Sequence, residues 1–439
     1  MLKVLKFGGS SLADANQFKK VAEIIKSENS RRYIVASAPG KRNSSDTKVT
    51  DMLLTCFKLA SEKNPIDDIF EKVTSRYNGI IADLGLDLNL EEDFAKIKFA
   101  ILNHVGSDYV ASRGEYLNSR ILAAYLGFDF VDAADGVFFK DNGTFDAEKT
   151  NAALKDMLQY HEYAVIPGFY GSMPNGTIKT FSRGGSDITG SIVARAVEAD
   201  LYENWTDTSG MLMADPRIVD DPKPIAEITY TELRELSYMG ASVFHEDAIS
   251  PVKKADIPIN IRNTNRPDDK GTLIVPKSNV VSEHIITGVV GRKGFTAIFV
   301  EKDMMNSEVG FGRKVLEVIE KHGVCFEHLP SGIDTMSVVV SSKDIKEIKG
   351  NITAELVKAV DPDSITLFEN LALVAVVGRG MIRTEGTAMR TFKALADAHV
   401  NVRMIDQGSS ELNIIIGIEE KDYETAIKAI YAEFVKSNN

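Results

Sequence analysis

The sequence predicts an α/β protein in which a mostly parallel sheet is sandwiched by helices and is followed by two small ferredoxin-like βαββαβ units. Up to about residue 275, short apolar runs of strand type alternate with helical segments, as where 33–38 precedes 52–60. Runs that are apolar throughout are typical of strands buried on both faces, and their alternation with helices is typical of βαβ units. Near Pro276 the pattern changes, and the rest of the chain carries an internal repeat.

The repeat predicts the paired units. Segment 315–340 aligns without a gap on 391–416, and Gly332 falls on Gly408. Each copy contains a helical stripe, a strand, a turn with glycine and a second strand, and a further helical segment follows. The first copy then closes with a strand at 364–370, whereas the second runs to the end of the chain without one.

A spare strand at 285–291 precedes the first copy, and we infer that it closes the second. The first unit, about 294–370, would then be inserted into a second unit that consists of 285–291 and 371–439. This predicts two domains, 1–280 and 281–439. Small paired units of this kind are more often ligand sensors than catalysts, and a purely structural role in dimerisation is the alternative.

The composition excludes several classes of protein. The 439 residues carry a formal net charge of −12, which argues against a general nucleic-acid or anionic-membrane binder. Two cysteines, Cys56 and Cys325, are too few for a disulfide framework or a zinc site, and the seven histidines form no ligand-spaced pair. No apolar run approaches about 18 residues, and the start has no cleavage-like site. We therefore expect a cytoplasmic enzyme or sensor with no nucleic-acid or membrane partner and no metal site built from protein side chains.

The stretch KFGGSS at 6–11 predicts an anion site. It lies between an apolar strand-like run and an amphipathic helical segment, where backbone N–H groups at a helix start can converge on a phosphate. Gly8 and Gly9 would let the phosphate approach closely, and Lys6 would supply positive charge. Taken alone, the same stretch also fits an ordinary tight turn.

Further motifs contain candidate binding groups. In SRGEYLNSR, Glu115 can pair with an ammonium group, or it can simply be an acid at a helix start. In FSRGGSD, Arg183 can grip a carboxylate with two parallel hydrogen bonds, and Asp187 can act in catalysis, as a helix N-cap, or as both. WTDTSG and ADPR carry Thr206, Asp207, Asp215 and Arg217, and for ADPR a loop salt bridge is the simpler explanation.

Together these motifs resemble, in order and spacing, those of aspartate kinases of the amino-acid-kinase superfamily. The resemblance rests on KFGGSS, SRGEYLNSR, SRGGSD, WTDTSG with ADPR, PINIRNT with GT, and the final IDQGSSELNIII, and it covers essentially the full length. The C-terminal repeat resembles a pair of ACT units, which bind amino acids and set feedback inhibition. The resemblance implies ATP-dependent phosphorylation of the aspartate side-chain carboxylate to 4-phospho-L-aspartate, the first step of lysine, threonine and methionine biosynthesis.

The resemblance also implies a role for each candidate residue. Lys6 would stabilise charge on the transferring phosphoryl oxygens and Asp187 would orient Lys6; no general base is needed, because the attacking carboxylate is already ionised at neutral pH. The nucleotide would lie against the backbone N–H groups of Gly8, Gly9 and Ser10 and near Thr206, Asp207, Asp215 and Arg217. The amino acid would be held by Glu115 and Arg183, beside Ser37, Thr50 and Ser186. Magnesium is expected mainly on the ATP phosphates and water.

Two departures from the family pattern concern nucleotide contacts. Where many family members have GAKVLHP, this chain has GASVFHED, so Ser242 and Glu246 replace a lysine and a proline. Leu212 stands where a tyrosine is often found after the WTD turn. The loop GKRNSSDTK at 40–48 is hard to align with the family, and it fits a flexible lid as well as an inert insertion.

We expect the first ACT unit to bind an inhibitory amino acid, with lysine as the main candidate and threonine as the second. MNSEVGFG at 305–312 leads into a helix whose start can receive an α-carboxylate, and PSGID at 330–334 offers a carboxylate to an ammonium group. The candidate effector residues are Met305, Ser307, Val309, His328 and Asp334. The repeat region should also hold a homodimer or a dimer of dimers. The alternatives to a regulated aspartate kinase are a kinase for another small carboxylate amino acid and a catalytically inactive ACT-based amino-acid sensor.

Overall fold

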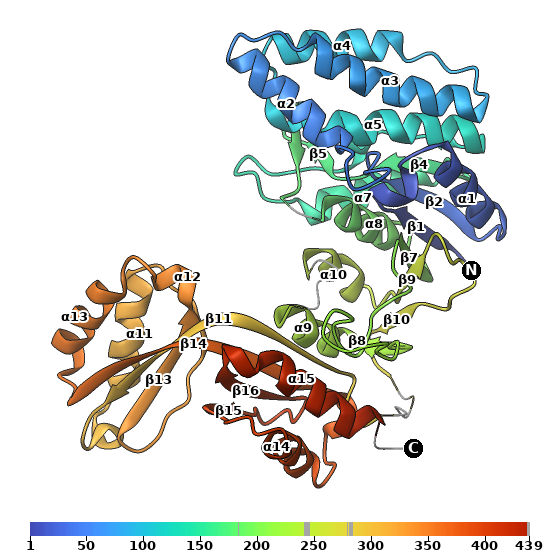
Figure 1. Cartoon of the computed structure of the whole chain (residues 1–439). Coiled ribbons are helices and arrows are strands. Elements are labelled where there is room, and N and C mark those ends of the chain that lie inside the picture. Colours follow the sequence, from blue (N-terminus) through green and yellow to red (C-terminus); the bar gives the residue numbers. More distant parts are fainter. Residues whose placement is uncertain (183, 241–245, 279, 281–283, 437–439) are drawn as a thin grey trace. The chain divides into compact units, whose positions relative to one another are not determined.

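The structure, a computed structural model, describes residues 1–436 apart from 183, 241–245, 279 and 281–283 (Figure 1). Its contacts divide the chain into two compact units. Unit 1 consists of Met1–Met211, Pro224–Tyr230 and Ser242–Ser278, and unit 2 consists of Leu212–Lys223, Thr231–Ala241 and Asn279–Asn439. Each unit is built around a large sheet of its own.

Unit 1 contains an eight-stranded sheet in the order β3-β4-β2-β1-β7-β9-β10-β8. Neighbouring strands are parallel except β9 and β10, which are antiparallel. The strands are β1 (Lys3–Phe7), β2 (Arg31–Ala36), β3 (Asp129–Phe130), β4 (Ala164–Pro167), β7 (Leu201–Thr206), β8 (Glu227–Thr229), β9 (Ile259–Asn263) and β10 (Thr272–Val275). A separate antiparallel pair joins β5 (Tyr170–Ser172) and β6 (Ile178–Thr180). The prediction of a mostly parallel sheet is confirmed.

Helices lie on both faces of this sheet. They are α1 (Ala15–Lys26), α2 (Val49–Ser61), α3 (Asp67–Leu84), α4 (Glu91–Leu102), α5 (Ser107–Leu126), α6 (Ala133–Gly136), α7 (Ala147–Leu158), α8 (Gly185–Ala196) and α10 (Glu246–Lys253). Leu5, Phe7 and Trp205 share one buried core with side chains of α1 to α5. Because successive residues of a strand point to opposite faces, Val4 and Lys6 face the other side, where α8 packs on β1. The predicted sandwich of helices around the sheet is confirmed.

The first elements show why these residues form the fold. All five residues of β1 are buried, as suits a strand in the middle of a covered sheet. Helix α1 begins after Asp14, whose carboxylate accepts the N–H of Gln17 at 3.0 Å and so caps the helix. Phe18, Val21 and Ile25 recur at helical spacing and are buried against the sheet.

Unit 2 contains a six-stranded antiparallel sheet in the order β12-β13-β11-β14-β16-β15. Its strands are β11 (Gly288–Glu301), β12 (Phe326–His328), β13 (Thr335–Ser341), β14 (Ser364–Val377), β15 (Met404–Asp406) and β16 (Asn413–Glu419). Its helices are α9 (Tyr230–Tyr238), α11 (Phe311–Lys321), α12 (Ser342–Ile345), α13 (Lys349–Val360), α14 (Thr387–Asp397) and α15 (Tyr423–Tyr431). The two ferredoxin-like units that the repeat predicts are confirmed.

Two long strands serve both copies of the repeat. β11 pairs with β14 along its length, from Gly288 beside Val377 to Glu301 beside Ser364. The second half of β11 also pairs with β13, and the second half of β14 pairs with β16. The strand order is therefore β14-β11-β13-β12 in the first copy and β11-β14-β16-β15 in the second. The sequence pattern predicts a separate strand at 285–291. In the structure, the end of that segment and the residues up to Glu301 form one continuous strand, β11, because β14 pairs with it along its whole length.

Helix α9 belongs to unit 2 although it precedes the C-terminal repeat in sequence. Its Glu232 is fully buried, accepts a hydrogen bond from Thr287 Oγ1 at 2.5 Å, and lies 3.0 Å from Arg379 Nη1. One turn further along, Glu235 accepts a hydrogen bond from Asn413 at 2.7 Å. These contacts fasten α9 to the C-terminal sheet and its connections.

The buried pair of Glu232 and Arg379 allows a test of this attachment. Arg379→Ala leaves the Glu232 carboxylate buried without that cation, and removing one partner of a buried pair costs about 3 kcal/mol or more. We therefore expect urea unfolding of the full chain, followed by circular dichroism, to show a free energy of unfolding lower by about 3 kcal/mol. Lys393→Ala, which breaks an exposed pair with Asp397, is the control and should leave the free energy of unfolding nearly unchanged. An equal decrease in the free energy of unfolding in the two variants would contradict the attachment of α9 through this pair.

Candidate functional site

The candidate site in unit 1 centres on an ion pair between the buried Lys6 and the partly exposed Asp187. Lys6 lies on β1, is 8% exposed, and its Nζ is 2.7 Å from Asp187 Oδ1 in the first turn of α8. Asn204 lies opposite Lys6 on the neighbouring strand β7, and its amide donates to the same Asp187 oxygen at 2.7 Å. Lys6 and Asp187 are predicted from the sequence motifs, whereas Asn204 is not, because its only signal is a polar residue within a buried strand. The pair joins the sheet to the start of α8. It leaves a fixed ammonium group near the carboxyl end of β1, and we call this end of the parallel strands the Lys6 edge of the sheet.

The glycine turn follows β1 directly. A Cβ on Gly9 would lie 2.9 Å from Ala38 O, and one on Gly40 would lie 2.6 Å from the Gly9 carbonyl carbon, so the turn packs backbone to backbone against the loop after β2. Gly9 opens the 3₁₀ helix η1 (Gly9–Leu12), whose first N–H groups have no partner within that helix. The N–H of Gly8, in contrast, donates to Trp205 O at 3.0 Å. In this structure Gly8 therefore anchors the turn.

Glu115 on α5 is a buried carboxyl at the same edge of the sheet. It is 6% exposed, and its Oε2 has no hydrogen-bond partner. A Cβ on Gly114 would lie 2.8 Å from Ala38 Cβ and 3.5 Å from Thr50 Oγ1, so only glycine lets α5 approach this loop. Burial raises the pKa of Glu115 to about 8. An orphaned, buried carboxyl oxygen of this kind is suited to receive a cationic group.

The neighbouring predicted residues are only partly described. Arg183, Ser242 and the side chain of Glu246 lie outside the described residues. Ser186 is buried at the start of α8, and a Cβ on Gly168 would lie 2.7 Å from its Oγ. The segment that follows β4 therefore runs directly against the predicted substrate residue Ser186.

Two further residues at this edge were missed by the sequence analysis. Asn118, one turn after Glu115, is fully buried and donates to the carbonyl of Ser37 at 2.7 Å, which fixes the end of β2. Phe169 has a φ of 81°, which is strained for a residue with a side chain, and its N–H donates to Thr189 Oγ1 at 3.0 Å. Asn118 lies within the SRGEYLNSR motif, but its role there follows only from the fold, and Phe169 belongs to none of the motifs.

The loop at 40–48 is fastened to α3. Asp46 accepts hydrogen bonds from Arg42, and Arg76 Nη2 lies 2.5 Å from its carboxylate. These hydrogen bonds and charges hold the pKa of Asp46 well below its usual range. Arg76 is buried and also donates to Gly40 O at 3.3 Å. Both the start and the middle of the loop are therefore anchored by one guanidinium group.

The predicted nucleotide residues fall into two pairs. Thr206 ends β7, its Oγ1 donates to Asp207 at 3.2 Å, and its carbonyl accepts the N–H of Thr264. Asp215 and Arg217 belong to unit 2, where Arg217 Nη2 lies 2.6 Å from Asp215 Oδ2. Hydrogen bonds from Arg217 lower the pKa of Asp215. The structure groups Thr206 and Asp207 with the Lys6 edge, and it groups Asp215 and Arg217 with each other.

Comparisons with known proteins match both parts of the chain. The model of the amino acid kinase family matches residues 1–263, and a model of the ACT domain matches residues 374–434. Aspartokinase 3 of Bacillus subtilis (strain 168) is 38% identical over 448 residues, which cover 99% of this chain and 98% of that protein. The chain belongs to the aspartokinase family. The crystal structure of Clostridium acetobutylicum aspartate kinase has a TM-score of 0.93 and 53% identity, and covers 99% of this chain and 100% of that chain.

This aspartokinase is thus a phosphotransferase, as its motifs imply. E. coli aspartokinase III in complex with aspartate and ADP shares the fold, with a TM-score of 0.75 at 22% identity over 99% of both chains. In the described part of the chain, no helix has both the length and the apolar character needed to cross a bilayer. Among the same residues, no three side chains gather as a metal-binding group.

The predicted effector residues of the aspartokinase lie within the first repeat copy in unit 2. Asp334 Oδ1 accepts the N–H of Met304 at 3.0 Å, so this carboxylate sits beside the turn that leads to α11. Met305 is buried, whereas Val309 is 97% exposed. His328 Nδ1 lies 2.6 Å from Asp406 on β15 of the second copy. That link between the copies was not predicted, because residues so far apart in sequence leave no local pattern.

The burial of Glu115 predicts a pH-dependent stability. Its folded pKa of about 8 lies above the ordinary value, so its destabilising effect grows as the pH rises from about 4 to 8. Glu115→Gln stays neutral at every pH. The free energy of unfolding of this variant, relative to that of the unsubstituted protein, should therefore be higher at pH 8.5 than at pH 5 by about 2 to 4 kcal/mol.

Thermal unfolding at the two pH values measures this gain. Glu92→Gln, at an exposed carboxylate on α4, is the matched control and should show no such gain. A difference between Glu115→Gln and the unsubstituted protein that stays constant with pH would show that the Glu115 carboxyl is not kept neutral by burial.

Proposed function

We propose that this aspartokinase transfers the γ-phosphoryl group of ATP to the side-chain carboxylate of aspartate and releases 4-phospho-L-aspartate and ADP. The observation that carries the proposal is the buried Lys6 ammonium, fixed by Asp187 beside a glycine turn and at the same sheet edge as the orphaned oxygen of Glu115. The ATP phosphates require a cation and backbone N–H donors, and the amino acid requires a carboxyl group for its ammonium. This end of the sheet provides all three. The product would enter lysine, threonine and methionine biosynthesis.

Phosphoryl transfer at this edge needs positioning and charge neutralisation. The aspartate carboxylate attacks Pγ as the bond from Pγ to the β,γ-bridging oxygen breaks, and Lys6 attracts the phosphoryl oxygens on which charge develops. Asp187, which also accepts a hydrogen bond from Asn204, would hold the Lys6 ammonium toward these phosphoryl oxygens. The N–H groups of Gly9 and Ser10 hold phosphate oxygens at the start of η1. Mg²⁺ carried on the ATP phosphates and water would neutralise further charge, and Asp207 at this edge is the carboxylate that its water shell would meet.

Substrate selection would rest on the groups around Glu115. Its carboxyl receives the α-ammonium of aspartate, and Arg183 receives the α-carboxylate through its planar fork. The hydroxyl groups that complete the amino-acid site are those of Ser37, Thr50 and Ser186. Thr206, Asp207, Asp215 and Arg217 would contact the rest of the nucleotide.

The C-terminal unit would make the kinase responsive to an amino acid, with lysine preferred over threonine. The turn that holds Met305, Ser307 and Val309 receives the effector carboxylate, and Asp334 receives a side-chain ammonium, with His328 beside it. Effector binding can shift the kinase only through a difference in affinity between its arrangements. The enzyme would work in the cytoplasm as a homodimer or a dimer of dimers.

The rival functions are an ACT-based sensor without catalysis and a kinase for another small carboxylate amino acid. The intact pair of Lys6 and Asp187 favours catalysis. An ADP-release assay with ATP, Mg²⁺ and a panel of amino acids separates the three. We expect release with aspartate and little with glutamate; release only with another amino acid would identify the rival kinase, and no release with any would favour the sensor.

Lys6→Ala tests the proposed chemistry. Loss of the ammonium removes a charge that matters most in the transition state, so kcat should fall by about 100-fold or more while ATP affinity changes less. ADP release measures kcat, and calorimetry with ADP measures affinity. Lys19→Ala, an exposed lysine on α1, is the control. An unchanged kcat in Lys6→Ala would remove this residue from the mechanism.

Asp334→Asn tests the effector site. An asparagine can still accept the N–H of Met304, so the turn is retained while the negative charge is lost. The lysine concentration for half inhibition should rise at least tenfold, with kcat in the absence of lysine close to that of the unsubstituted enzyme. Asp344→Ala, exposed in α12 of the same unit, should keep full sensitivity. Retained sensitivity in Asp334→Asn would refute this assignment.

A further inference from the structure

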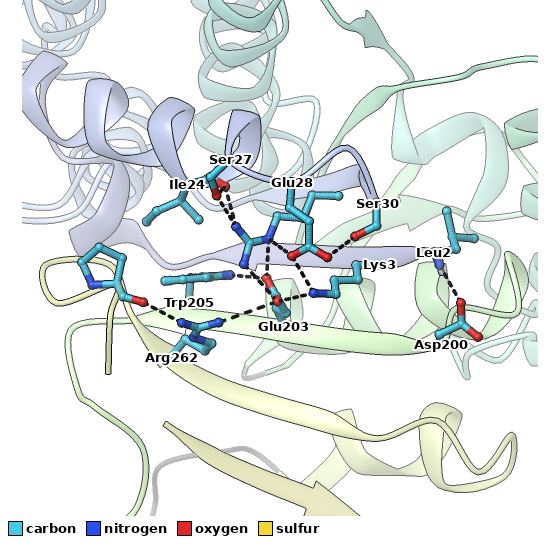
Figure 2. Close-up of polar contacts among 12 residues, drawn as sticks. Leu2, Lys3, Ile24, Ser27, Glu28, Ser30, Asp200, Glu203, Trp205 and Arg262 are labelled. Carbon is cyan, nitrogen blue, oxygen red and sulfur yellow. Dashed lines mark hydrogen bonds and ion pairs between the residues drawn. The ribbon is translucent and has the colours of Figure 1, made fainter. Parts of the chain in front are cut away.

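A buried carboxylate lies on the face of the sheet that the proposed chemistry does not use (Figure 2). Glu203 on β7 precedes Asn204 and therefore points to the face opposite the Lys6 side chain. It is 1% exposed, and Arg31 Nε and Nη2 approach its two oxygens at 3.0 and 3.2 Å. Lys3 Nζ lies at 3.5 Å. One carboxylate thus joins β2, β1 and β7, the strands that end at the site.

The same carboxylate fixes the side chain of Trp205. The indole Nε1 donates to Glu203 Oε2 at 3.0 Å, as drawn in Figure 2. The indole ring stacks against two guanidinium groups, with Arg31 at 5.4 Å and Arg262 at 4.7 Å from its centroid, and against the Phe7 ring at 6.0 Å. The acceptor Glu203 and several ring contacts hold the indole in a single orientation, and they anchor Trp205 on the strand β7 that pairs with β1.

Two connections run from this cluster to the glycine turn. The carbonyl of Trp205 accepts the N–H of Gly8 at 3.0 Å. Arg262, which lies 4.0 Å from Glu203, donates to Pro267 O at 2.6 Å and so holds the loop after β9. In that loop, the buried hydroxyl of Thr264 lies 2.8 Å from Ser11 Oγ at the end of the turn. Both ends of the turn therefore rest on groups that Glu203 orients.

We propose that Glu203 is a positioning residue for the phosphate turn, and that it acts through Trp205 and Arg262. This inference rests on the proposed phosphoryl transfer from ATP. Glu203 does not touch a substrate; it sets where the N–H groups of Gly9 and Ser10 lie relative to Lys6. Because misplacement of a reacting group by about 1 Å can cost up to 100-fold in rate, such indirect support is kinetically visible.

A merely structural cluster would behave differently. It would change the stability of the folded protein and leave the kinetics of the folded fraction unaltered. A positioning role changes the ATP-dependent parameters and leaves the KM for aspartate unaltered, because Glu115 lies on α5 and not on the turn. Trp205 is the single tryptophan of the chain, so its emission reports the cluster directly.

The central variant is Glu203→Gln, in the full-length enzyme. We expect kcat/KM for ATP to fall at least tenfold, the KM for aspartate to stay within twofold, and the emission of Trp205 to shift. Glu28→Gln is the matched control. Within the described part of the chain, Glu28 pairs with Lys3 at 2.7 Å and lies 3.7 Å from Arg31, but it makes no hydrogen bond or ion pair with Trp205 or Arg262. Its kinetics should stay within twofold of those of the unsubstituted enzyme.

A second pair of variants keeps the test decisive if Glu203→Gln does not fold. Thr264→Val removes the hydroxyl that meets Ser11 and keeps the shape, so kcat/KM for ATP should fall at least threefold, and Thr264→Ser should restore it. Indistinguishable Thr264→Val and Thr264→Ser enzymes, or a folded Glu203→Gln enzyme with unaltered ATP kinetics, would overturn the positioning role. Absence of ADP release from the unsubstituted enzyme would instead overturn the proposed function.

Discussion

The ion pair between Lys6 and Asp187 is the interaction on which the site depends. A buried ammonium is costly unless a carboxylate meets it, so Lys6 on the central strand requires a partner from the helix that covers its face. That partner lies in the first turn of α8, where a negative charge also suits the helix dipole. Asn204 completes the arrangement from the adjacent strand. The geometry of β1, β7 and α8 is thereby fixed at the point where phosphate is expected.

The two faces of the sheet have different tasks. One face carries Lys6 and Asn204 toward α8, and the other carries Glu203 and Trp205 into the core beneath α1 to α5. A strand that alternates polar groups on both faces would be unstable unless each group found a partner, and here each of these does. The proposed phosphate site on one face therefore has a cluster of paired polar groups on the opposite face of the same strands. Close packing at Gly9 brings the loop after β2 to the same edge.

The sequence predicts the parts of this protein that have local patterns. Alternating apolar runs predict the parallel sheet, the repeat predicts the two ferredoxin-like units, and short motifs identify Lys6 and Asp187. What it does not predict depends on register between distant segments. Asn204 meets Asp187 only because β7 lies beside β1. His328 on β12 meets Asp406 on β15 although the two strands stand at opposite ends of the strand order. The same limit applies to Gly8, whose N–H is taken by a carbonyl almost two hundred residues away in sequence.

The central claim is that an aspartate carboxylate attacks the γ-phosphoryl group of ATP at the Lys6 edge. Its product is an acyl phosphate, which hydroxylamine converts into a stable hydroxamate. The most direct measurement is therefore mass spectrometry of the hydroxamate formed from ATP, Mg²⁺, aspartate and hydroxylamine, with ADP counted in the same sample. The account predicts the hydroxamate of the aspartate side-chain carboxylate in equal amount to ADP. ADP without hydroxamate, or hydroxamate formed from another amino acid in preference to aspartate, would contradict it.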